Sequence, residues 1–141
     1  MFIILKVIYD PYIGYLREIN ASKTLQKELD KYGLTVSDNA RGIRMSRDVL
    51  DHAFATDCFV VEKKTNNPIC AIQIKGFSYL SKNVELKREL SRNVKKGFNR
   101  LKHKWGLNGF VLATDEAGNV YQPHLKSILE YAEMFLQKEL A

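Results

Sequence analysis

The sequence lacks the features that mark a disulfide-stabilised, zinc-binding or membrane-spanning protein. Its two cysteines, Cys58 and Cys70, lie inside apolar runs and form no C-x-x-C pair, which argues against a zinc site and indicates a reducing compartment. The opening apolar run at residues 2–5 is far shorter than the about 20 residues that span a membrane, and no signal-peptide layout surrounds it. We therefore expect a soluble, cytoplasmic protein with no membrane partner.

Internal repeats, low-complexity stretches and linkers are also absent, so a single domain over residues 1–141 is expected. A chain of this length buries about two-thirds of its unfolded surface and needs no disulfide or structural metal to fold. The formal net charge of +6 suits a polyanion partner, although many basic proteins bind none. Charge alone therefore gives only modest support for nucleic-acid binding.

The first half of the chain predicts a strand and then a helix. Phe2–Tyr9 is rich in β-branched and aromatic residues and ends at a turn signal, Asp10-Pro11. Tyr15–Tyr32 carries an imperfect helical stripe and is followed by Gly33, a natural stop. Residues 34–48 give no readable pattern, and Val49–Ala55 is either a short strand or a loop.

The second half gives clearer signals. Cys58–Lys63 and Ile69–Lys75 form a hairpin that is apolar on both faces, as expected of strands in a covered sheet. A helix over Val84–Trp105, a strand over Phe110–Ala113 and a helix opened by Pro123 follow. The order strand, helix, hairpin, helix, strand, helix predicts an α/β protein with a mixed central sheet flanked by helices.

The hairpin carries three polar residues that suit phosphodiester hydrolysis. Asp57 precedes the first strand, and Gln73 and Lys75 end the second. Hydrolysis needs an activated water and neutralised phosphate charge, which nucleases often obtain from divalent cations on oxygen ligands with a lysine beside the water. Gln73 is also an amide within an apolar strand, where it requires a hydrogen-bond partner.

These three side chains share a face of the sheet only under a geometric condition. Residues 73 and 75 are two apart, so they point the same way. Asp57 joins them only if paired residue numbers have an even sum, for example 57 opposite 75. That requires a hairpin loop with an odd number of residues, or a bulge. A regular four-residue loop at 65–68 would put Asp57 on the other face.

The stretch DCFVVEKKTNNPICAIQIKG, at residues 57–76, resembles the motif of PD-(D/E)XK nucleases: an acidic residue, a hairpin, then E/D/Q-x-K. The glutamine version is most similar to the endonuclease subunit of heteromeric transposases. The resemblance implies a restriction-endonuclease-like fold, with a helix and a strand after the lysine. It also implies that Asp57 and Gln73 hold Mg²⁺ or Mn²⁺, with the Ile74 carbonyl as a further ligand, and that Lys75 lies beside the water.

Many members of the family add a glutamate from the preceding helix. The candidates are Glu18 and Glu28, and we favour Glu18 because it lies nearer the expected helix start. Gln73 departs from the commoner acidic residue, and a neutral amide binds a cation less strongly than a carboxylate. That substitution puts metal affinity, and activity itself, in question.

The helix over Val84–Trp105 is the second candidate region, because it is densely basic. A solvated outer face is the ordinary interpretation of such a helix, but like charges repel one another and phosphates would relieve that repulsion. Such contacts would position a nucleic-acid backbone without reading its sequence. The candidate residues are Lys87, Arg88, Arg92, Lys95, Lys96, Arg100, Lys102 and Lys104.

The sequence thus predicts a metal-dependent endonuclease that hydrolyses DNA. Many members of the family that it resembles work as dimers or inside larger complexes, so the resemblance makes a homodimer or a larger nucleoprotein complex plausible. Two alternatives remain open. One is a non-catalytic nucleic-acid-binding or assembly module with the same fold. The other is an RNA-cleaving nuclease, such as a toxin.

Overall fold

The computed structural model describes the backbone of residues 2–77 and 84–140 and the side chains within 13–77 and 91–140. It contains a four-stranded sheet in the order β1-β2-β3-β4, with β1 (Leu34–Ser37), β2 (Cys58–Glu62), β3 (Pro68–Lys75) and β4 (Asn108–Ala113). The first three strands are antiparallel neighbours, and β4 runs parallel to β3. The predicted class, a mixed α/β sheet flanked by helices, is confirmed.

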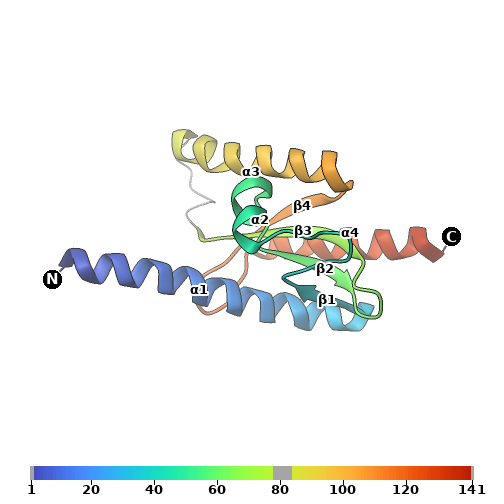
Figure 1. The fold of residues 1–141 in the computed structure, drawn as a ribbon. Coiled ribbons are helices and arrows are strands. Elements are labelled where there is room, and N and C mark those ends of the chain that lie inside the picture. Colours follow the sequence, from blue (N-terminus) through green and yellow to red (C-terminus); the bar gives the residue numbers. More distant parts are fainter. Residues whose placement is uncertain (1, 78–83, 141) are drawn as a thin grey trace.

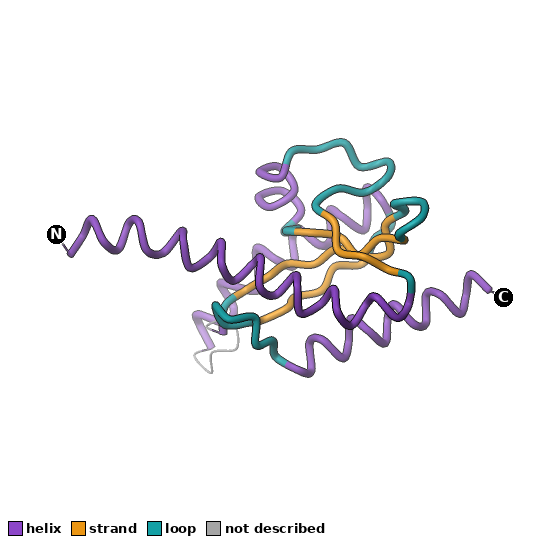
Figure 2. The backbone as a smooth tube through the Cα atoms, turned by 90° about the horizontal axis from the view of Figure 1, so that it is seen from below, coloured by secondary structure: helices purple, strands orange, loops and turns teal. Residues whose placement is uncertain are grey.

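Helices cover both faces of this sheet (Figure 1). On one side lie α1 (Phe2–Leu29) and α4 (Gln122–Leu140), which cross the sheet together in Figure 2. On the other side lie α2 (Arg47–Phe54) and α3 (Val84–Trp105). Because successive strand residues point to opposite faces, the buried strands supply two separate cores.

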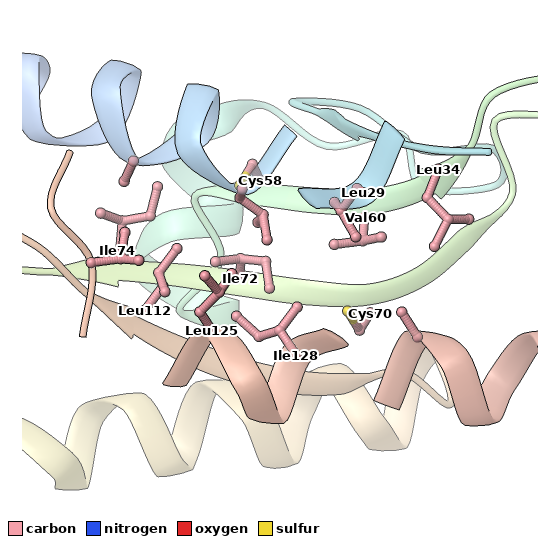
Figure 3. Packing of buried hydrophobic residues seen from close by; sticks show 14 of the residues in the cluster. Leu29, Leu34, Cys58, Val60, Cys70, Ile72, Ile74, Leu112, Leu125 and Ile128 are labelled. Carbon is pink, nitrogen blue, oxygen red and sulfur yellow. The ribbon is translucent and has the colours of Figure 1, made fainter. Parts of the chain in front are cut away.

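The larger core joins the sheet to α1 and α4. Its strand residues include Val60 of β2 and Ile72 of β3, and Figure 3 shows Leu125 and Ile128 of α4 lying among them. Cys58 and Cys70 are buried in this core as free thiols. The smaller core packs α2 and α3 against Phe59, Val61 and Ala71.

The prediction for the N-terminus was wrong. Phe2–Tyr9 is not a strand but the start of α1, which also contains most of the predicted helix Tyr15–Tyr32. A short apolar run does not distinguish a strand from a helix, and β-propensity is a weak guide to either. Pro11, taken as a turn signal, stands within α1, where it removes one main-chain hydrogen bond. The first part of α1 extends beyond the sheet in Figure 1.

Two elements between residues 34 and 55 escaped prediction. Residues 34–37 form the edge strand β1, and Val49–Ala55, expected as a strand or a loop, lies mostly in the helix α2. Ser46 caps this helix, because its side chain accepts a hydrogen bond from the Val49 N–H. The hairpin strands, α3, β4 and the start of α4 lie within two residues of their predicted bounds. Gly33 and Gly106, which follow the helical segments before β1 and β4, have left-handed conformations.

The free edge of β1 is covered by a side chain from α1. The Gln26 amide oxygen accepts from the Val36 N–H at 2.7 Å, and its nitrogen donates to the Leu34 carbonyl at 3.3 Å. The Gln26 amide thus makes two of the backbone hydrogen bonds that a neighbouring strand would make. Covering an exposed edge in this way protects it from pairing with another chain.

In the part of the chain that the structure describes, no helix has both the length and the apolar character needed to cross a membrane.

The contact between α2 and α3 gives a test of the packing. A Cβ on Gly97 would lie 2.6 Å from the Ala55 Cβ and 2.7 Å from the Ala55 nitrogen. Backbone cannot move aside cheaply, so we expect Gly97→Ala to lower the free energy of unfolding by about 1–3 kcal/mol in urea denaturation. Gly14→Ala is the matched control, since nothing lies within 4 Å of its added Cβ. It should be neutral or stabilising by up to about 1 kcal/mol. Equal stability of the two variants would contradict this packing.

Candidate functional site

A β-bulge sets the geometry of the hairpin. Near the site, Cys58 pairs with Ile72 and Val60 with Cys70, but Val61 then pairs with Pro68. The register shift between Val60 and Val61 changes the sum of paired residue numbers from odd near the turn to even near the site. The condition stated from the sequence is therefore met. Asp57 lies opposite residue 73 and not opposite residue 75, but both pairings have an even sum and place Asp57 on the same face.

Asp57 and Gln73 contact each other directly across the two strands. The Gln73 Nε2 donates a hydrogen bond to Asp57 Oδ2 at 2.8 Å, and the Ile74 N–H donates to the same oxygen at 2.7 Å. Gln73 is 4% exposed on a central strand, so this bond supplies the partner that its buried amide requires. Asp57 Oδ1 accepts no hydrogen bond from the residues that the structure describes.

Lys75, the third residue predicted for the site, lies at the end of β3. It is half-buried, and by alternation it lies on the face of Gln73. Its positive charge acts to lower the pKa of Asp57, so the two side chains are within electrostatic reach. The Ile74 carbonyl points toward the β2 side, as its N–H does, because both main-chain groups of one strand residue face the same neighbour.

The structure brings Glu18, and not Glu28, to this group. Glu18 of α1 and Asp57 line two adjoining hollows of about 350 and 260 Å³. Glu28 lies ten residues further along α1, or about 15 Å, where it pairs with Lys31 at 3.4 Å. The predicted preference for Glu18 over Glu28 agrees with the position of Glu18 beside Asp57. That Glu18 contributes to a metal site stays a prediction.

Several residues of the site were missed from the sequence because α2 was not foreseen. Asp48 and Asp51 of α2 line the smaller hollow, and Arg47 lines both. Arg47 Nη2 also lies 3.6 Å from Glu18 Oε2. Ser46 followed by apolar Leu50 and Phe54, four residues apart, is the signal that could have revealed this helix. On α1, the Arg17 guanidinium lies against Gly76, immediately after Lys75.

The electrostatics of Asp57 are dominated by its burial. Burial raises the pKa of Asp57 to about 7, and the carboxylates of Glu18 and Asp51 act in the same direction. The Ile74 N–H and the Lys75 ammonium oppose the shift without cancelling it. A buried carboxylate near other carboxylates is stabilised by whatever neutralises its charge, either a proton or a cation.

These donors suit a hard cation better than a soft one. They are carboxylate and amide oxygens, which Mg²⁺ and Mn²⁺ prefer. Among the described residues, no three His, Cys, Asp or Glu side chains gather closely enough to hold a metal ion by themselves. The residues therefore fit a cation that keeps most of its water and is held by one or two carboxylates, as is usual for Mg²⁺.

The basic candidates on α3 are placed differently. The side chains of Lys87 and Arg88 lie outside the described residues. Lys102 and Lys104 are exposed near Trp105, which leads into the start of β4. That start pairs with Cys70, at the far end of β3 from Lys75. Arg92, Lys95 and Lys96 are exposed, and about 18 Å of helix separates Arg92 from Lys104. Arg100 donates to the Ala53 carbonyl at 3.2 Å, which ties it to the end of α2.

Comparisons of this chain with protein-family models, with curated proteins and with solved structures found no match. The resemblance to PD-(D/E)XK nucleases gains no support from them. It depends on the hairpin residues and their geometry.

The pKa of Asp57 predicts a pH-dependent stability. Without metal, the folded protein keeps a proton on Asp57 that the unfolded chain loses above its ordinary pKa of 3.8. The free energy of unfolding therefore falls as pH rises from about 4 to 7, by up to about 4 kcal/mol from this group. Asp57→Asn cannot ionise and escapes this loss. Between pH 4.5 and 8, we expect the free energy of unfolding of Asp57→Asn to rise relative to that of the wild type, as measured by urea denaturation with EDTA. A pH-independent difference would show that Asp57 titrates normally.

A second carboxylate at residue 73 tests the cation directly. Gln73→Glu places a like charge against Asp57, so without metal it should lower the free energy of unfolding by about 1–3 kcal/mol. Mn²⁺ should then raise the melting temperature of the variant more than that of the wild type, because a ligand stabilises the state that binds it. Thermal unfolding with EDTA or Mn²⁺ measures both. If Mn²⁺ shifts neither protein, the site does not bind this cation.

Proposed function

We propose that the protein is a metal-dependent endonuclease that hydrolyses DNA phosphodiester bonds. The observation that carries this proposal is the contact of Asp57 with Gln73, on the strand face that Lys75 shares. Asp57 also lines the two hollows that Glu18 lines. The family resemblance requires this juxtaposition of Asp57 and Gln73. The helix and strand that follow Lys75, α3 and β4, agree with the same resemblance.

Each residue has a role that its position allows. Asp57 would hold the cation through Oδ1, which the described residues leave without a hydrogen bond. Glu18 or Asp51 would contact it directly or through water, and the Ile74 carbonyl faces the same side. Bound Mg²⁺ or Mn²⁺ would supply Lewis-acid polarisation of the phosphate and a more acidic water. The Lys75 ammonium would orient that water by hydrogen bonding and would stabilise the negative charge on the phosphate.

Gln73 has a positioning role in this arrangement. Its amide nitrogen donates to Asp57 Oδ2, as the Ile74 N–H does, so both donors fix the carboxylate and leave Oδ1 without a bond from the described residues. In the bound state the amide could act either in this way or, after rotation, through its oxygen as the ligand that the resemblance implies.

A second candidate is a nucleic-acid-binding module without catalytic activity. Two observations favour it: Gln73 donates its amide to Asp57, and no three ligating side chains converge among the described residues. This candidate requires phosphate binding with a steep salt dependence and no cleavage with any metal.

A cleavage assay separates the candidates. Purified protein is incubated with supercoiled plasmid and, in parallel, with RNA, in EDTA, Mg²⁺ or Mn²⁺. The proposal expects metal-dependent nicking of DNA, lost in Asp57→Asn and reduced about 10²–10³-fold in Lys75→Ala. Lys126→Ala, an exposed lysine on α4, is the control and should nick normally.

Three outcomes would count against the proposal. Binding without nicking under every condition would favour the non-catalytic module. Cleavage of RNA alone would replace DNA as the substrate. Nicking that persists in folded Asp57→Asn would remove this site from consideration.

A further inference from the structure

Three arginines follow one another at intervals of three residues, two in the segment that joins β1 to α2 and one at the first residue of α2. Arg41, Arg44 and Arg47, which we call the arginine loop together with the residues between them, are all exposed. Figure 2 shows this connection as a loop that runs from the β1 edge of the sheet to the start of α2. It therefore reaches the site from the side opposite to the β4 edge.

The backbone of the arginine loop is anchored. Ala40 and Ile43 are buried in the core beneath α2, and the Ile43 N–H donates to the Ala40 carbonyl at 3.1 Å. Gly42 provides the positive φ of 84° that this tight turn needs. The Arg41 N–H donates to the Asn66 carbonyl in the hairpin at 2.9 Å. The arginines thus project from a fixed support, which lowers the entropy lost when they bind a ligand.

Acidic and basic side chains separate in this region. Asp38 and Asp48, next to the arginine loop in sequence, line the hollows beside Asp57, whereas Arg41 and Arg44 line neither hollow. Within the described part of the chain, Arg41 and Arg44 form no ion pair. Carboxylates able to attract a cation therefore line the hollows, and Arg41 and Arg44 lie outside them, without ion-pair partners among the described residues.

Arg47 stands at the boundary between these two regions. Its only ion pair within the described residues, with Glu18, spans 3.6 Å, and its side chain is 66% exposed. An exposed pair of this length contributes little stability, so a better partner displaces it readily. A phosphate is such a partner, because a guanidinium can bind two of its oxygens at once.

We propose that the arginine loop binds the sugar-phosphate backbone of a nucleic acid and directs it to Asp57, with Arg47 exchanging Glu18 for a phosphate. The direction toward Asp57 rests on the proposed function, whereas the binding itself does not. The arginine loop supplies a contact surface on the side of β1, next to the site. The cations at the C-terminal end of α3 lie at the far end of the sheet from Lys75.

Binding in EDTA tests this surface independently of cleavage. Fluorescence anisotropy of a labelled 20-nucleotide DNA duplex is measured from about 50 to 300 mM salt. Each of Arg41→Gln, Arg44→Gln and Arg47→Gln should weaken binding and lower the slope of log K against log salt by about 1. The triple variant should bind at least about tenfold more weakly at 100 mM salt. Circular dichroism melting checks that each variant is folded.

Matched variants separate this surface from a general effect of charge. Lys126→Gln removes one exposed cation from α4 and should leave the slope nearly unchanged. Glu18→Gln frees Arg47 and should strengthen binding. Wild-type affinity and slope in the folded triple variant would overturn the inference, even if the protein nicks DNA. A reduced slope in a protein that nicks nothing would support the inference while removing the nuclease proposal.

Discussion

The bulge in the β2–β3 hairpin is the constraint on which the candidate site depends. Side chains alternate along a strand, so one residue of register decides whether Asp57 lies with Gln73 or on the opposite face. The shift between Val60 and Val61 makes that choice. With this register, apolar side chains of β2 and β3 fill the cores on both faces of the sheet. The polar residues Asp57, Gln73 and Lys75 then share one face at the ends of the strands. The same local irregularity thus serves folding and the site.

The segment before β2 is held in a conformation that the chain would not otherwise prefer. Ala55 has a φ of 50°, which costs a non-glycine residue roughly 1–2 kcal/mol. Its N–H and that of Thr56 both donate to the Leu50 carbonyl, and Gly97 of α3 packs closely against it. These contacts carry the chain from the end of α2 to Asp57 within two residues. The unfavourable local conformation at Ala55 and the raised pKa of Asp57 thus lie within two residues of each other.

How far the sequence predicted each element depends on the kind of signal that it carried. The helix α3 had charged residues around a regular apolar stripe, and the predicted bounds are those observed. The first apolar run, at residues 2–9, and the polar stretch at residues 34–55 have no such alternation of charged and apolar residues. The edge strand β1 is four residues long and depends on Gln26 of α1 for part of its hydrogen bonding. Such a strand cannot be found without knowing that α1 passes beside it.

The sequence by itself determined the sheet-and-helix class, the hairpin and the identities of Asp57, Gln73 and Lys75, because periodicity and residue spacing are local properties of the chain. Tertiary structure decided which face Asp57 occupies, since the bulge between Val60 and Val61 sets that face and appears only in the pairing of β2 with β3. It also decided that Glu18, Asp51 and Arg47, spread over 34 residues on two helices, meet at one hollow. Charged residues that folding brings together show no recognisable spacing in the sequence. Their separation along the chain depends on how the backbone folds and not on the chemistry of the side chains.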